Sequence, residues 1–346
     1  MKFSYALIVG LSLTALPLHA AGLDDLTYAT TDGKVTIRFC KSAATGKLVI
    51  PDTIEGNPVT SIGVGAFYEC IDLTSITIPD SVTVIGAGAF QFCSRLTSIT
   101  ISDSVTSIGK SAFSGCRSLT NITIPGSVTS IGDLAFVECT NLASITFGEE
   151  SKLTSIGKAA FSSCINLTSI TIPDSVTSIR SGAFSYCASL TSITIPDGVT
   201  SIGDVTFSDC SNLTSITIGD SVTSIEEGAF VECTSLASIT FGEEGKLTSI
   251  GKAAFSSCSS LTNITIPDSV TSIRSGAFSY CASLTSITIP DGVTSIGDVT
   301  FSDCSNLTSI TIPDSVTSIG DGLFTTCSSL TAVTFLGDAP KEGKEV

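Results

Sequence analysis

The chain has 346 residues, of which 42% are hydrophobic and 14% are charged. That hydrophobic content excludes intrinsic disorder as the main state of the chain. There are 32 acidic and 16 basic residues, giving a formal net charge of −16. This acidic balance argues against nucleic acid or an anionic membrane as a partner, because both are recognised by basic patches.

Residues 1–21 are typical of a secretory signal peptide. Lys2 supplies the positive start, residues 6–18 are mostly apolar, and Leu18-His19-Ala20 resembles the small-residue pattern of a cleavage site. An uncleaved anchor helix is the alternative, but the apolar segment is shorter than the roughly 20 residues that a membrane span needs. We therefore expect export to the extracellular space, the cell surface or the periplasm, with no membrane insertion elsewhere in the chain.

Residues 22–47 differ from everything that follows. They contain the alternating stretch TYATTDGKVTIRFCKS, which includes Cys40 and is typical of β-strands. An array of stacked repeats needs a cap over the open end of its core. We predict that residues 22–47 form a β-type amino-terminal cap.

Residues 48–336 are built of repeats. The unit that starts at Leu73 reads LTSITIPDSVTVIGAGAFQFCSR, and its cysteine recurs at intervals of 23 or 25 residues. The two 25-residue units replace IPDSV with FGEESKL and FGEEGKL. Residues 139–232 and 233–326 are near copies, offset by 94 residues or four units. Such periods are the signature of a stacked, quasi-one-dimensional architecture.

The pattern within a unit predicts the path of one coil. Leu73, Ile76 and Ile78 match the L-x-x-L-x-L strand of a leucine-rich repeat. A short extended run follows, with Gly86 expected to supply the next turn, and the spacing of A-F-x-x-C suits one short helical turn facing the core. We predict a right-handed superhelical solenoid of about 12 coils, with one parallel β-strand, a short extended run and a short helical turn in each.

The unit L-x-x-I-x-I-P-x-x-V-x-x-I-G-x-x-A-F-x-x-C resembles the BspA-like, or Treponema-type, leucine-rich repeat. The resemblance covers residues 48–336, and residues 337–346 are expected to be a carboxyl-terminal tail. It implies a secreted or cell-surface protein, in a family with several members implicated in adhesion to host proteins. No binding residue carries over, because the motif positions are core positions.

The exposed strand positions are the first candidate binding face. In most units they read Thr, Ser and Thr, with exceptions such as Asn121 and Asn263, so a regular array of hydroxyl groups is expected along the solenoid. The array could meet a repetitive protein or glycan surface, and a merely solvated β-face is the alternative. The predicted face comprises Thr97, Ser98, Thr100, Thr168, Ser169, Thr171, Thr191, Ser192, Thr194, Thr308, Ser309 and Thr311.

The turn after each strand is acidic and forms a second candidate surface. Asp recurs there, either as a solvated turn residue or as a weak cation ligand. The 25-residue units carry longer loops on the same edge, and these are candidates for a nonuniform contact surface. Their residues are Glu149, Glu150, Lys152, Glu243, Glu244 and Lys246.

The expected burial of the repeated Phe and Cys residues, and the lack of a histidine in the mature chain, argue against catalysis. The Phe and Cys of each unit are expected to be buried in ladders, with the thiols mostly free, although export would also permit disulfides. His19 is the one histidine, and it leaves with the signal peptide, so no Ser-His or Cys-His pair is possible in the mature chain. We expect no enzyme, no cofactor and no metal site.

These observations predict a non-enzymatic interaction module. It would act in adhesion or in protein or glycan binding, through the Thr/Ser face or the acidic turn edge. A self-associating structural or surface-coat protein is the alternative.

Overall fold

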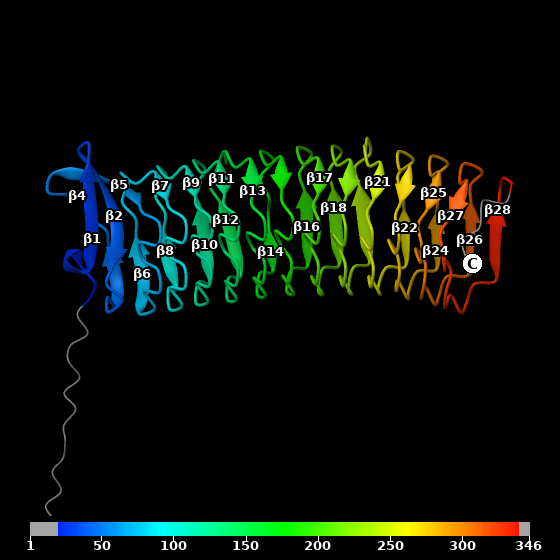
Figure 1. The fold of residues 1–346 in the computed structure, drawn as a ribbon, viewed down its shortest axis with the longest axis horizontal. Coiled ribbons are helices and arrows are strands. Elements are labelled where there is room, and N and C mark those ends of the chain that lie inside the picture. Colours follow the sequence, from blue (N-terminus) through cyan, green and yellow to red (C-terminus); the bar gives the residue numbers. More distant parts are fainter. Residues whose placement is uncertain (1–19, 339–346) are drawn as a thin grey trace, which may run out of the picture.

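The computed structural model describes residues 20–338. Most of the predicted signal peptide and of the predicted tail therefore lies outside the described residues. The chain winds as a long β-solenoid, coil after coil, from its amino-terminal to its carboxyl-terminal end (Figure 1). The predicted repeat solenoid is confirmed.

One side of the solenoid is a continuous sheet, here called the long sheet. Its Ser-Ile strands come from the predicted extended run, so each coil contributes two strands rather than one. They pair in parallel with like residues in register, as Ser130 does with Ser107 and Ser155. In spatial order the strands are β1 (Leu26–Thr31), β2 (Lys34–Cys40), β5 (Asn57–Ile62), β7 (Val84–Ile85), β9 (Ser107–Ile108), β11 (Ser130–Ile131), β13 (Ser155–Ile156), β15 (Ser178–Ile179), β17 (Ser201–Ile202), β19 (Ser224–Ile225), β21 (Ser249–Ile250), β23 (Ser272–Ile273), β25 (Ser295–Ile296) and β27 (Ser318–Ile319).

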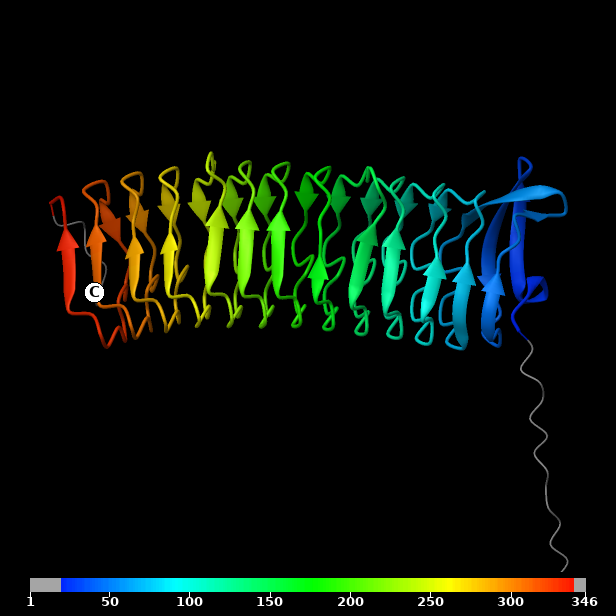
Figure 2. The same ribbon diagram turned by 180° about the vertical axis from the view of Figure 1, so that it is seen from behind.

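The other side carries the predicted leucine-rich-repeat strands and is called the face sheet (Figure 2). Its parallel strands fall into four groups, which end after β8, β14, β20 and β28. They are β3 (Gly46–Val49), β6 (Leu73–Thr77), β8 (Ser98–Thr100), β10 (Asn121–Ile124), β12 (Ser144–Phe147), β14 (Ser169–Ile170), β16 (Ser192–Ile195), β18 (Ser215–Ile218), β20 (Ser238–Phe241), β22 (Asn263–Thr265), β24 (Ser286–Thr288), β26 (Ser309–Ile312) and β28 (Ala332–Phe335).

The amino-terminal end is a β-hairpin stacked on the first coil. After the short 3-10 helix η1 (Leu23–Asp25), β1 and β2 pair antiparallel around a turn at Asp32-Gly33, where both residues have positive φ. An Asp-Gly pair suits such a turn because both positions tolerate the left-handed conformation. β2 then joins β5 in parallel, and the small strand β4 (Thr53–Ile54) pairs antiparallel with β5.

The predicted short helical turn is wrong. Among residues 20–338 the only helix is η1. The Ala-Phe corner is instead a run of hydrogen-bonded turns: the Cys93 N–H donates to the Phe90 oxygen at 3.2 Å, while the Phe90 N–H donates to Ala112 of the next coil at 2.7 Å. Left-handed residues, such as Gly88 and Phe92, make this path possible. Bonding between coils therefore replaces bonding along a helix.

Gly86 has a different role from the one expected. Its backbone does not require positive φ, but a Cβ there would lie 2.8 Å from the backbone carbon of Gly63 in the preceding coil. Glycine is needed because two backbones approach closely.

The core between the two sheets is a stack of aromatic rings. Twelve Phe side chains, from Phe67 to Phe324, stack with centroids 5.0–6.0 Å apart and planes within 14°. A column of free thiols lies beside it, and from Cys93 onward each thiol donates to a Phe carbonyl of the coil before, as Cys93 does to Phe67 at 3.1 Å. The Cys residue thus combines apolar packing with a donor for a second lone pair of that carbonyl.

Candidate functional site

All twelve predicted face residues are exposed on the face sheet or at its strand ends. They point outward because they alternate along each strand with buried residues, such as Ile193 and Ile195 of β16. The structure does not gather them into one cluster. They are three stretches of the same rows, near β8, near β14 and β16, and near β26.

The three hydroxyl rows of this face are not equivalent. The row that contains Thr97 bonds back to the preceding coil: the Thr97 hydroxyl donates to the Thr74 carbonyl at 2.9 Å. Thr168, Thr191 and Thr308 do the same at 3.3–3.5 Å. This row therefore belongs to the scaffold, since its hydrogen-bonding capacity is used within the solenoid.

The other two rows remain available to a ligand. In the part of the chain that the structure describes, the hydroxyl groups of Ser98 and Thr100, and of their counterparts in the predicted face, make no side-chain hydrogen bond. Parallel pairing holds them in register, with Ser192 opposite Ser215 and Thr194 opposite Thr217. Adjacent hydroxyls in a row are therefore spaced by about 4.8 Å, the distance between neighbouring strands.

The predicted edge loops follow β12 and β20 and are exposed. Their six candidate residues are Glu149, Glu150, Lys152, Glu243, Glu244 and Lys246. The backbone is tied down on both loops: the Lys152 N–H donates to the Gly126 oxygen at 2.9 Å, and the Lys246 N–H donates to the Asp220 oxygen at 3.1 Å. The loops thus present their charged side chains on an anchored backbone.

Two matching hollows lie where the face sheet meets these loops. They measure about 380 and 480 Å³ and are centred on the half-buried rings of Phe147 and Phe241, which occupy the Ile position of ordinary coils. Each also contains two face threonines and a proline from the next coil: Thr146, Thr171 and Pro173 in the first, Thr240, Thr265 and Pro267 in the second. Sequence reasoning missed both rings, although the change from IPDSV to FGEE marked them.

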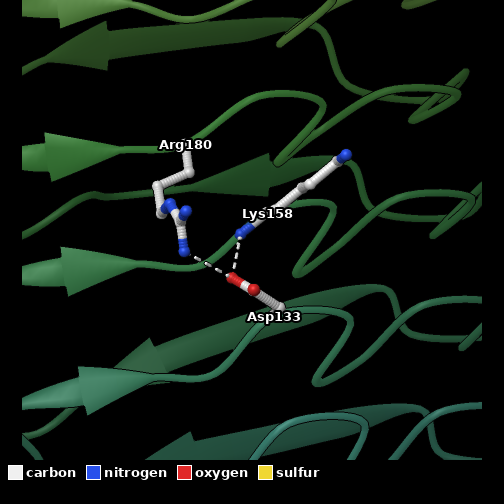
Figure 3. A network of polar contacts seen from close by, with 3 residues as sticks. All are labelled: Asp133, Lys158 and Arg180. Atoms are coloured by element: carbon white, nitrogen blue, oxygen red, sulfur yellow. Dashed lines mark hydrogen bonds and ion pairs between the residues drawn. The ribbon is translucent and has the colours of Figure 1, made fainter.

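A polar network on the long-sheet side was also missed. Arg180 follows β15 and reaches across the intervening coil to Asp133, after β11, where its Nη1 lies 3.0 Å from Oδ1 (Figure 3). The same carboxylate oxygen accepts the backbone N–H of Lys158 at 2.7 Å. The signal in the sequence was SIR in place of the usual SIG. This exposed network lies away from the hydroxyl rows, and we treat it as structural.

Asp209 lies at a corner of the solenoid, directly before Cys210. Burial, and then the neighbouring Glu232 carboxylate, raise the pKa of Asp209.

Within residues 20–338 no group of three or more His, Cys, Asp or Glu side chains could hold a metal ion. Over the same range no helix has the length and apolar character needed to cross a bilayer.

The repeat sequence matches the family description "BspA type Leucine rich repeat region (6 copies)" over residues 60–188, 154–255 and 243–339. The chain belongs to the BspA-type leucine-rich repeat family. Comparison with curated proteins gave no match.

Solved structures agree with this membership. A leucine-rich repeat protein from Bacteroides ovatus is 32% identical, with a TM-score of 0.69 over 93% of this chain and 78% of that one. The pneumococcal vaccine antigen PcpA shares the fold at 19% identity and a TM-score of 0.52, over 90% of this chain and 97% of its own. The family is one of non-enzymatic interaction modules with surface proteins among its members.

Proposed function

We propose that the protein is an exported interaction module that binds a repetitive protein or glycan surface in adhesion. Binding would use the two unbonded Ser and Thr rows, with the Phe147 and Phe241 hollows as anchor points. The observation that carries the proposal is the repetition of one aromatic hollow, flanked by free hydroxyls, at two places on one face.

The spacing of the hollows favours a repetitive target. They are four coils apart, so the rings are separated by about 19 Å at the ordinary distance between strands. Two weak, equivalent sites held at a fixed distance can raise apparent affinity by roughly 10²–10⁴ without any new contact. A target that repeats on that length scale would engage both.

The chemistry of the face favours a neutral or amine-bearing target. Hydroxyl groups both donate and accept, and a partly exposed ring offers an apolar surface, a combination suited to sugars and to polar peptides. Glu243 lines the second hollow, and Glu149 stands on the corresponding loop of the first. Together with the net charge of −16, these carboxylates disfavour anionic polymers.

The test is binding of purified protein to a glycan array and to immobilised surface proteins. Phe147→Ala and Phe241→Ala should each weaken binding modestly, and the double variant should lose most of the avidity. The matched control is the double variant Tyr186→Ala/Tyr280→Ala, which removes another exposed aromatic pair 94 residues apart. Unchanged binding in the Phe double variant, with loss in the Tyr double variant, would place the site at the Ala-Phe corner instead.

Sedimentation distinguishes the alternative of self-association. A binding module should remain monomeric as its concentration is raised. Assemblies that grow with concentration, and that persist in the Phe double variant, would favour the structural or coat role.

A further inference from the structure

Two cysteines meet where the amino-terminal hairpin joins the first coil. Cys40 is the last residue of β2, and Cys70 is the first member of the thiol column. The Cys40 sulfur lies 3.7 Å from the Lys41 carbonyl oxygen, and the Cys70 sulfur lies 4.0 Å from that same oxygen. The Cys70 sulfur is also 3.7 Å from the Cys40 carbonyl oxygen. Both sulfurs therefore converge on one short piece of backbone.

The acceptors of the Cys40 and Cys70 thiols differ from those of the other thiols in the column. In the repeats each thiol donates to a Phe carbonyl of the coil before, as Cys116 does to Phe90 and Cys139 does to Phe113, both at 3.1 Å. Cys70 is preceded by the hairpin rather than by a coil, so no such Phe carbonyl is present. Its thiol donates to the carbonyl oxygen of Cys40 instead.

We propose that Cys40 and Cys70 are a redox pair that closes into a disulfide in an oxidising compartment and fastens the hairpin covalently to the first coil. The remaining cysteines stay reduced, because each of their thiols is directed at its own Phe carbonyl in a preceding coil. A disulfide needs two sulfurs that can approach each other, and at the junction the two thiols share one acceptor, the Lys41 carbonyl oxygen.

The chemistry is thiol–disulfide exchange with a low-molecular-mass disulfide such as oxidised glutathione. The Cys70 sulfur attacks one sulfur of the oxidant, forms a mixed disulfide and releases one glutathione thiol. The Cys40 sulfur then attacks Cys70, releasing the second glutathione thiol. The protein loses two electrons and two protons, and the oxidant gains both. The neighbouring Cys40 thiol lowers the pKa of Cys70, which favours Cys70 as the attacking thiolate.

Access to the buried sulfurs requires only a local opening. Cys40 and Cys70 are 1% and 0% exposed, but they lie at the end of the array. The hairpin packs on a coil from one side only, and terminal units of a stacked array open more readily than central ones. Oxidation would suppress this opening, because it closes a loop between the hairpin and the coil.

The experiment is to equilibrate the purified, reduced protein with oxidised glutathione, quench it with acid, denature it and count the reactive thiols. We expect eleven, two fewer than the thirteen cysteines of the sequence. Tryptic digestion should give one linked species that joins residues 39–41 to residues 48–95, with fragmentation placing the bond at Cys70 and not at Cys93. Proteolytic cleavage within the hairpin should also slow in the oxidised form.

Variants provide the matched control. Cys40→Ala and Cys70→Ala should each form no internal disulfide and should lose at most one thiol, to glutathione, whereas Cys116→Ala, in the column, should still lose two. Thirteen thiols after oxidation of the wild type would overturn the proposal, as would a bond between neighbouring column members such as Cys116 and Cys139. The peptide map of the wild type decides the matter even where a variant does not fold.

Discussion

Arg180 crosses a whole coil to reach Asp133, with 3.0 Å between Nη1 and Oδ1. Four coils later the equivalent acid is Glu227, and its Oε1 pairs with Lys252 Nζ at 3.2 Å instead. Glu227 has one methylene more than Asp133, and the two acids pair with different basic residues on otherwise similar surfaces.

The first prediction concerns this ion pair. Asp133→Asn should lower the free energy of unfolding by about 0.2–1 kcal/mol, because exposed ion pairs contribute little. The loss should shrink in high salt, since screening weakens exposed charges. Urea denaturation at low and high salt measures it, with Glu227→Gln, four coils later, as the control. A loss that is large and independent of salt would contradict an exposed, screened pair.

The second prediction concerns the ring stack. Phe207 is fully buried and stacks on Phe184 at 5.5 Å and Phe230 at 5.3 Å, so Phe207→Ala should destabilise the protein by about 3–5 kcal/mol. Phe324 is half-buried and stacks only on Phe301, at 6.0 Å. Phe324→Ala should therefore cost less in chemical denaturation. Equal destabilisation by Phe207→Ala and Phe324→Ala would argue against a solenoid in which each coil is stabilised mainly by its nearest neighbours.

The third prediction concerns the thiol column. Burial raises the pKa of Cys139 and Cys210 to about 12, so neither forms an appreciable thiolate at pH 8. Native protein should label slowly with a thiol reagent at these positions, and reduced protein in denaturant should label at all of its cysteines. Mass spectrometry of the labelled peptides measures both. Rapid native labelling of Cys210 would show that the central coils open far more often than the packing implies.

The fourth prediction concerns backbone strain at the corner. Val205 has φ of 46°, whereas the equivalent Gly182 and Gly228 adopt 66° and 60° without strain. Because a β-branched residue is unfavourable there, Val205→Gly should stabilise the protein by about 1 kcal/mol. The control is Val64→Gly, at an exposed corner position outside the left-handed region, which should destabilise by about 0.4–1 kcal/mol. Thermal denaturation of both variants tests the difference in sign.

The fifth prediction concerns pH. Burial and Glu232 raise the pKa of Asp209 above its ordinary value of 3.8, so the folded state binds this proton more tightly than the unfolded state. The associated stability is present below pH 3.8 and is lost as pH rises through the raised pKa. Asp209→Asn should therefore be more stable than the wild type near neutral pH, and this advantage should vanish in acid.

The control for that prediction is Asp303→Asn. Asp303 occupies the same position in the second block, but Thr326 replaces the acid of the next coil. Melting curves from pH 3 to pH 7 should separate the two variants. An equal gain in both would mean that the repulsion from Glu232 has no effect.

Periodicity allowed the sequence to predict the solenoid, its core columns and the exposed rows. A Phe or Ile that recurs in every unit is expected to lie in the core between the sheets. The corner could not be predicted, because residues such as Val205 rarely adopt left-handed angles and nothing local indicates that they do here.

The candidate face was only partly predictable for a similar reason. Thr97 and Thr100 look alike in sequence, and only the stacking of coils reveals that Thr97 is hydrogen-bonded backwards while Thr100 is not. The Phe147 ring, in turn, is half-buried, whereas Ile124 at the same position of the coil before is fully buried. Both differences depend on neighbours 23 or more residues away along the chain.

The unequal continuity of the two sheets has a mechanical consequence. The long sheet runs unbroken from β1 to β27, whereas the face sheet is interrupted after β8, β14 and β20. The solenoid should therefore bend most easily where the face sheet is interrupted. The continuous hydrogen bonding of the long sheet should keep the length of that side nearly constant. Such bending changes the separation of the Phe147 and Phe241 rings, so the solenoid can adjust its reach to a target whose repeat is not perfectly regular. Electron-microscopic images of single molecules would reveal this as curvature variation in one plane.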